Sequence, residues 1–180
     1  MNGIALLPLT RASQEVAQFL SLALAEVFSV PCRVLPEEIP LAPYYNGERR
    51  QYHSTPILQQ LMAVAGRGDT SHVLGVLDVD LYIPILTFVY GEARLGGCCA
   101  LISTCRLHQA FYGLPEDEVL FLRRSEKEAI HELGHTLGLT HCRDYECVMH
   151  YSQSVEYIDL KRSTFCADCH RALGLPRRWW

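Results

Sequence analysis

The segment HELGHTLGLTH contains residue types whose spacing could bind a metal ion and support hydrolysis. On an α-helix the imidazoles of His131 and His135 leave the same face, so both can reach one zinc ion. Glu132 would lie beside that metal, where its carboxylate could take a proton from a zinc-bound water. Gly138 can adopt a positive φ, which would end the helix and bring His141 back as a third ligand.

Three histidine ligands would leave one coordination position of zinc open, which is typical of catalytic rather than structural sites. A water molecule bound there has a pKa of about 7 and becomes a nucleophile at neutral pH. The alternative is an ordinary amphipathic helix with surface histidines. That alternative does not explain five specified residues at fixed spacing, so we interpret the segment as a catalytic zinc site.

Four cysteines after the histidine segment could form a second metal site. Cys142 and Cys147 offer two thiols across a short loop, and Cys166 and Cys169 offer two more in a C-x-x-C pair. Four thiolates complete a tetrahedral shell around zinc, so we expect this site to be structural. The alternative, a thioredoxin-like redox pair at Cys166 and Cys169, lacks a preceding βαβ pattern and leaves the other two thiols without a role.

The composition of the 180-residue chain, with 49% hydrophobic and 20% charged residues, fits one globular domain. We expect residues 1–130 to supply the sheet and packing helices, and residues 131–180 to form the zinc-binding segment. The net charge of −4 argues against nucleic acid or an anionic membrane as a partner. Without a basic export signal or an apolar run of about 20 residues, we expect a cytoplasmic protein, and a monomer.

Hydrophobic periodicity predicts the elements that would hold these residues. Helices are predicted from about Arg11 to Phe28, from an N-cap at Thr55 to Gly66, and from Pro115 through Leu137. Strands are predicted near the N-terminus and at Val30–Leu35, His72–Leu77, Thr87–Tyr90 and Cys98–Thr104. The last helix would present the two helical histidines rigidly.

The last two predicted strands should form an antiparallel hairpin through Gly96 and Gly97. One of them could lie at the sheet edge, where unpaired backbone groups could accept a peptide as an additional strand. The loop of residues 36–53 carries tyrosines and arginines that could line a substrate cleft or remain solvated. Asp78 and Asp80 could bind calcium, although capping or turn roles fit two carboxylates better.

The full pattern H-E-x-x-H-x-x-G-x-x-H-C-x4-C-x-M, followed by C-x-x-C, resembles the archaemetzincins, zinc metalloproteases of the metzincin clan. Residues 74–95 resemble the family's strand region, and residues 50–52 do so more loosely. The resemblance implies a compact α/β (α+β) domain with a mixed, twisted five-stranded sheet, an antiparallel edge strand, a long active-site helix and a C-terminal helix. It also implies a cleft along that edge strand.

The resemblance also implies a role for each motif residue and two zinc ions per chain. It assigns His131, His135 and His141 to the catalytic zinc and Glu132 to general base and acid. The four cysteines Cys142, Cys147, Cys166 and Cys169 would bind the structural zinc. Met149 matches the Met-turn, in which a methionine forms an apolar floor beneath the histidines.

Tyr151 follows Met149 by two residues, the spacing at which astacin-like and serralysin-like metzincins carry a tyrosine near zinc. Its phenol could bind the metal or donate a hydrogen bond to the oxyanion that forms on the substrate carbonyl. Alternatively, it could simply pack beside the Met-turn. The sequence leaves both interpretations open.

The hypothesis that follows is a zinc-dependent metallopeptidase that binds a peptide or protein substrate along an edge strand. One alternative is a catalytically weak, zinc-stabilised peptide-binding protein. A less favoured alternative is a metal-dependent ribonuclease, whose similar three-histidine motif has no glutamate after the first histidine. The presence of Glu132 therefore favours peptide hydrolysis.

Overall fold

A five-stranded sheet forms the centre of the protein in the computed structural model, which describes residues 1–36, 38–65 and 70–174. Across the sheet its strands are, in order, β2 (Cys32–Val34), β1 (Ile4–Pro8), β5 (His72–Leu77), β8 (Cys99–Ser103) and β7 (Gly91–Ala93). The first four run parallel, and β7 runs antiparallel to β8 at the edge. The expected mixed sheet with an antiparallel edge strand is confirmed.

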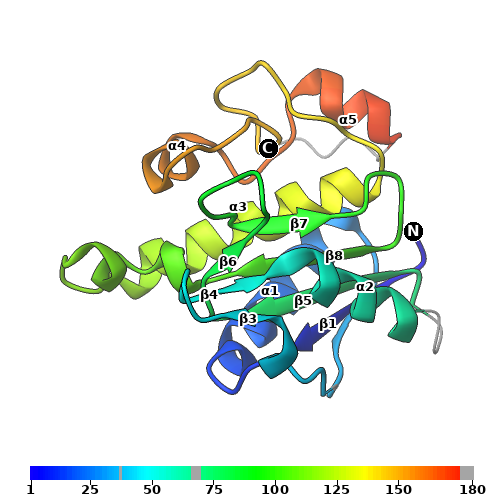
Figure 1. Ribbon diagram of the computed structural model, residues 1–180. Coiled ribbons are helices and arrows are strands. Elements are labelled where there is room, and N and C mark those ends of the chain that lie inside the picture. Colours follow the sequence, from blue (N-terminus) through cyan, green and yellow to red (C-terminus); the bar gives the residue numbers. More distant parts are fainter. Residues whose placement is uncertain (37, 66–69, 175–180) are drawn as a thin grey trace.

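Helices cover both faces of this sheet (Figure 1). Helices α1 (Ser13–Phe28) and α3 (Glu118–Thr136) pack on one face, and α2 (Ser54–Val64) packs on the other. Successive strand residues point to opposite faces. Leu6 and Leu74 are therefore buried under α1 and α3, whereas Leu7 and Val73 are buried under α2. This packing fixes α3, the helix with the first two histidines, beside the sheet edge.

The connections between the elements of the main sheet contain a second, small sheet and several 3-10 helices. A second sheet contains β3 (Tyr45–Asn46), β4 (Gln51–His53) and β6 (Leu81–Tyr82) and follows the 3-10 helix Ala42–Tyr44. The expected loop of residues 36–53 therefore contains two short strands. The 3-10 helices Cys105–Leu107 and Gln109–Tyr112 connect β8 to α3.

The C-terminal part of the described chain crosses over α3 (Figure 1). It contains α4 (Val155–Leu160) and α5 (Ala167–Leu173). The guanidinium of Arg124, in α3, donates from Nε and Nη2 to the carboxylate of Asp159, in α4, at 2.7 Å each. This ion pair fixes α4 against α3. None of the described helices is both long enough and apolar enough to cross a membrane.

The edge strand does not lie where the sequence predicted it. The predicted strand Thr87–Tyr90 was wrong, because only Val89 forms a bridge, to Leu81, while the strand β7 begins at Gly91. Glycine and glutamate have low strand propensity, so the pairing of β7 is decided by its packing against β8 and α3. A hairpin with its turn at the predicted glycines is present, but it joins β7 rather than Thr87–Tyr90 to β8, and its turn donates a hydrogen bond from Gly96 N to His135 O at 2.9 Å.

The start of α2 also differs from the prediction. The N-cap position is His53, and Thr55 lies inside the helix. The hydroxyl of Thr55 donates instead to the carboxylate of Glu92, in β7, at 2.8 Å. The Thr55 hydroxyl is therefore bound to a carboxylate distant in the sequence and does not accept a hydrogen bond from the helix backbone as an N-cap would. The predicted helix end at Gly66 lies outside the described residues.

Candidate active site

Helix α3 positions the first two histidines, and the turn after it positions the third. The helix begins at Glu118, three residues later than the predicted start at Pro115, and Oδ1 of the preceding Asp117 accepts a hydrogen bond from Leu120 N at 3.0 Å. Beyond the helix, Gly138 adopts the predicted positive φ, of 91°. The chain then returns, so that ligand atoms of His131, His135 and His141 lie within 4.8 Å of one another.

Backbone carbonyls determine which ring nitrogens of His131 and His135 face the site. Nδ1 of His131 lies 2.8 Å from the carbonyl oxygen of Val148, and Nδ1 of His135 lies 2.7 Å from that of Leu139. A carbonyl oxygen only accepts hydrogen bonds, so each Nδ1 carries the proton and each Nε2 keeps its lone pair.

The two Nε2 atoms, of His131 and His135, converge to 3.1 Å. Two lone pairs at this distance repel each other unless a cation lies between them. The separation is close to the roughly 3.3 Å between two nitrogen ligands of a tetrahedral zinc ion. The histidine cluster therefore fits zinc by its donor atoms and by its geometry.

The electrostatic environment favours neutral imidazoles. Burial lowers the pKa of His131 well below its ordinary value, and the positive charge of Lys161 lowers it further. Burial is also the main cause of the lowered pKa values of His135 and His141. Because neutral imidazole is the form that binds zinc, all three side chains are prepared for the metal at neutral pH.

Glu132 lies in a buried position between α3 and the edge strand. Burial raises its pKa well above the ordinary value, and the charge of Glu128 raises it further. A carboxylate with a raised pKa suits a general base. An added Cβ at Gly91 would lie 2.6 Å from Cγ and 2.7 Å from Oε1 of Glu132. This role of Gly91 was not predicted from the sequence, although a glycine in a strand often marks such a close approach.

Met149 packs against α3 at Gly134, the residue that precedes His135. The side chain of Met149 is fully buried, and an added Cβ at Gly134 would overlap its sulfur. The same Cβ would lie 3.3 Å from the ring of Phe165. Gly134 thus provides the space for the methionine, and sequence reasoning missed this role because the neighbour comes from a distant segment.

The structure places Tyr151 beside the third histidine. The ring centroids of Tyr151 and His141 lie 5.0 Å apart, and Tyr151 is 42% exposed. Both residues line the same cleft as Glu132. The position is compatible with either interpretation of this tyrosine.

The four cysteines predicted as metal ligands also come together. The sulfur atoms of Cys142, Cys147, Cys166 and Cys169 lie within 4.8 Å of one another. The Cys142 and Cys166 sulfurs are 3.7 Å apart, close to the roughly 3.8 Å expected for two thiolates on a tetrahedral zinc ion. All eight cysteines are described, and none forms a disulfide. The amide of Cys166 donates to the sulfur of Cys147 at 3.3 Å, a contact that suits a thiolate ligand.

One loop joins the cysteine cluster to the histidine cluster. Cys142 follows His141 directly, and its amide donates to the carbonyl of Met149 at 2.9 Å. The intervening Val148 carbonyl is the acceptor of the hydrogen bond from His131. A metal held by the cysteines would therefore also hold the segment that orients the histidines.

An open cleft of about 570 Å³ passes the histidine cluster between β7, α3 and the segment after Met149. The carbonyl of Tyr90 and the amide of Arg94 bond to β8. Backbone groups alternate in direction along a strand that pairs in this way. Those of Gly91 and Ala93 therefore face away from β8, toward the open edge of the sheet.

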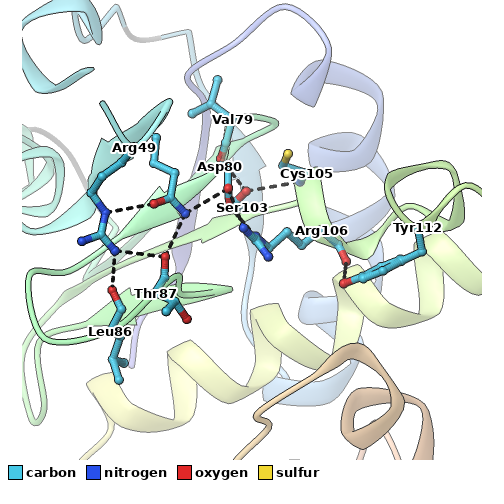
Figure 2. Close-up of polar contacts among 10 residues, drawn as sticks. Arg49, Val79, Asp80, Leu86, Thr87, Ser103, Cys105, Arg106 and Tyr112 are labelled. Atoms are coloured by element: carbon cyan, nitrogen blue, oxygen red, sulfur yellow. Dashed lines mark hydrogen bonds and ion pairs between the residues drawn. The ribbon is translucent and has the colours of Figure 1, made fainter. Parts of the chain in front are cut away.

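Arginine and glutamine side chains of the segment 36–53 donate hydrogen bonds to the backbone of the segment 86–88, which forms one rim of this cleft (Figure 2). Nη2 of Arg49 donates to the carbonyls of Leu86 and Thr87 at 2.7 and 3.2 Å. Nε2 of Gln51 donates to the same Thr87 carbonyl at 2.9 Å. Leu86 and Thr87 line the cleft. The segment 36–53 therefore contributes to the cleft indirectly, through its hydrogen bonds to Leu86 and Thr87.

Asp80 connects this rim to the end of β8. Its carboxylate accepts a hydrogen bond from Gln51 at 3.0 Å and two from Arg106, at 2.6 and 2.8 Å (Figure 2). The guanidinium of Arg106 also lies 4.1 Å from the ring centroid of Phe88 in the rim. Asp80 therefore forms an ion pair in place of a calcium site.

Known proteins are similar to this chain in sequence and in fold. A model of peptidase family M54 matches residues 11–174. The archaemetzincin of Methanocaldococcus jannaschii is 43% identical over 171 residues, which cover 94% of this chain and 92% of that protein. The crystal structure of the archaemetzincin from Archaeoglobus fulgidus, complexed with malonate, aligns with a TM-score of 0.81 at 37% identity, over 94% of this chain and 99% of that chain. The crystal structure of a zinc-dependent peptidase from Methanocorpusculum labreanum aligns with a TM-score of 0.84 at 28% identity, over 95% of this chain and 100% of that chain.

The contact between Gly134 and Met149 predicts that Gly134→Ala destabilises the protein. The added methyl group overlaps a fully buried side chain, so we expect the free energy of unfolding to fall by about 1–3 kcal/mol, as for other overpacked cores. Chemical denaturation measures this change. Gly47→Ala is the control, because nothing lies within 4 Å of its added Cβ, and it should stay within about 0.5 kcal/mol of wild type.

A double variant tests the assignment to this contact. Met149→Ala removes the atoms that the new methyl group would meet, so the effects of Gly134→Ala and Met149→Ala should not add. Additive effects, or a Gly134→Ala protein as stable as wild type, would contradict tight packing at this position.

Proposed function

This chain belongs to peptidase family M54, the archaemetzincins, and from that premise we propose how its residues share the work of peptide hydrolysis. Membership makes the protein a zinc metallopeptidase. We propose that His131, His135 and His141 hold the catalytic zinc and that the cysteine cluster holds a structural zinc. The converging Nε2 atoms and the sulfur separation support these two sites.

The observation that carries the mechanism is the buried carboxylate of Glu132 beside the histidine cluster, at the wall of an open cleft. A zinc ion held by His131, His135 and His141 would act as a Lewis acid that lowers the pKa of a water molecule and polarises the scissile carbonyl. Glu132 accepts the proton of the attacking water at a carboxylate oxygen and then delivers it to the leaving amine. Gly91 and α3 hold that carboxylate in place from two sides.

The substrate binds in an extended conformation along β7. The backbone groups of Gly91 and Ala93 that face away from β8 can pair with a peptide, which then becomes an additional strand of the sheet. Gly91 also contacts Glu132, so a peptide bound there has its backbone next to the general base. The short edge strand thus serves both to align the substrate and to position the catalytic carboxylate.

Tyr151 stabilises the transition state from the opposite wall of the cleft. Its ring packs against His141, and its partial exposure leaves the phenol free to turn toward the substrate carbonyl. A hydroxyl at that place donates a hydrogen bond to the oxyanion as negative charge develops.

Replacing Glu132 with Gln tests the general base. The amide keeps the size of the side chain but cannot take the proton, so kcat should fall by at least about 100-fold with unchanged zinc content. Turnover of a peptide library and elemental analysis measure the two quantities. Glu118→Gln, an exposed change in the first turn of the same helix, should leave both unchanged. Wild-type turnover in the Glu132→Gln protein would rule the mechanism out.

Replacing Tyr151 with Phe tests the oxyanion role. Because this hydrogen bond forms in the transition state, kcat and kcat/KM should fall together, by about 10- to 1000-fold, while zinc content and stability stay at wild-type values. Tyr157→Phe, on α4, is the matched control and should have wild-type kinetics. A Tyr151→Phe protein that cleaves at the wild-type rate would show that this tyrosine only packs.

Zinc analysis tests the two-site proposal. We expect two zinc ions per chain, of which a chelator removes only the histidine-bound ion, because four thiolates leave no open coordination position. Cys166→Ser should lose the chelator-resistant ion and unfold at a lower temperature, whereas Cys32→Ser should retain both ions. A single ion in the wild-type protein, or a fully stable Cys166→Ser variant, would contradict a structural cysteine site.

A further inference from the structure

The polar side chains that line the cleft without a role in the proposed hydrolysis include Glu128 in α3, Tyr90 just before β7, and Ser152 just after Tyr151. The side chain of Tyr90 is buried, with 5% exposure. The hydroxyl oxygens of Tyr90 and Ser152 are buried, and neither has a hydrogen-bond partner among the described residues. Buried hydroxyls are nearly always paired, so two unpaired ones in the wall of a cleft point to a ligand that completes them.

Glu128 is held in place by a buried lysine. Nζ of Lys161 donates to Oε1 of Glu128 and to the carbonyl of His150, at 3.1 Å each. This bridge places the segment that contains Ser152 next to Glu128. The Lys161 side chain has no exposed surface, so it does not itself reach the cleft. No described residue donates a hydrogen bond to Oε2, the other oxygen of Glu128, which leaves an acceptor for a ligand.

These three groups lie near the reacting bond. Glu128 lies one helical turn before Glu132, and Tyr90 precedes Gly91, which contacts the Glu132 side chain. Burial raises the pKa of Tyr90, and the neighbouring Tyr112 and then the charge of Glu128 raise it further, consistent with Glu128 lying near the Tyr90 hydroxyl. A substrate side chain that enters this part of the cleft therefore comes from a residue adjacent to the scissile bond.

The charges and hydrogen-bonding groups select the kind of side chain. The negative charge of Glu128 is already balanced by Lys161, so a buried cation or anion of the substrate would lack a counter-charge. An apolar side chain would leave the carboxylate oxygen and both hydroxyls unpaired. A carboxamide instead offers two donors for Oε2 of Glu128 and an acceptor for a hydroxyl of Tyr90 or Ser152.

We propose that Glu128, Tyr90 and Ser152 form a specificity subsite for a carboxamide side chain, that of glutamine or asparagine, next to the scissile bond. The proposal rests on the proposed peptidase function. It adds to that function a preference for one chemical class of residue.

Peptide binding tests the subsite without turnover. The zinc-loaded Glu132→Gln protein is titrated by calorimetry with peptides that differ only at one position beside the scissile bond, as identified by cleavage with the wild-type enzyme. Glutamine and methionine have similar size and shape, so we expect the glutamine peptide to bind about 10-fold more tightly, and lysine and glutamate peptides to bind more weakly than either. Equal or tighter binding of the methionine or lysine peptide overturns the subsite. Failure of the wild-type enzyme to cleave any peptide overturns the proposed function instead.

Two single-oxygen variants test the residues. Tyr90→Phe and Ser152→Ala each remove a hydroxyl that has no described protein partner, so neither should lower the thermal stability. Each should reduce the ratio of glutamine to methionine affinity by about 3- to 10-fold. Tyr157→Phe, outside the cleft, should leave the ratio unchanged. An unchanged ratio in both cleft variants, as expected if a structural water fills the site, or a marked loss of stability, overturns the assignment.

Discussion

The hydrogen bond from Nδ1 of His131 to the carbonyl of Val148 is the constraint on which the site depends. It selects the tautomer of a histidine that we propose as a metal ligand, and it contacts the loop that carries both Cys147 and Met149. That loop has little regular structure of its own, and its neighbours α4 and α5 are short. The cysteine cluster joins this loop to α5, and a metal ion held there would add to the apolar packing of Val148, Met149 and Ile158.

The site also depends on the close packing of neighbouring elements against α3. A glycine makes this packing possible on each of two sides of the helix. At Gly91 the edge strand contacts the Glu132 carboxylate, and at Gly134 the side chain of Met149 contacts the helix between His131 and His135. A methyl group at either position would push apart the elements that meet there. Helix α3 is thus packed between the sheet edge and the Met149 loop, and an added methyl group would disrupt the packing on either side.

The sequence predicted α3, β5 and the convergence of both ligand sets, because fixed spacing and apolar periodicity depend only on neighbouring residues. Features that depend on distant partners were missed. The hydroxyl of Thr55 binds Glu92, 37 residues away, so its local capping signal was misleading. The edge strand at Gly91 has weak intrinsic strand propensity and is formed by its tertiary packing. The subsite hydroxyl of Tyr90 likewise became visible only when the absence of a partner could be seen among the described residues.

The anchored rim of the cleft bears on which proteins such a peptidase can attack. Arg49 and Gln51 hold the backbone of Leu86 and Thr87 through hydrogen bonds, so the width of the cleft is set when the enzyme folds. If the substrate pairs with β7 as proposed, it must become extended on binding, and most of the entropy lost is then that of the substrate chain. A folded protein exposes such a segment only at frayed ends or through local opening. The rate at which a folded protein is cleaved would therefore depend on the population of its locally opened form. Proteins with low local stability would be cleaved faster than stable ones.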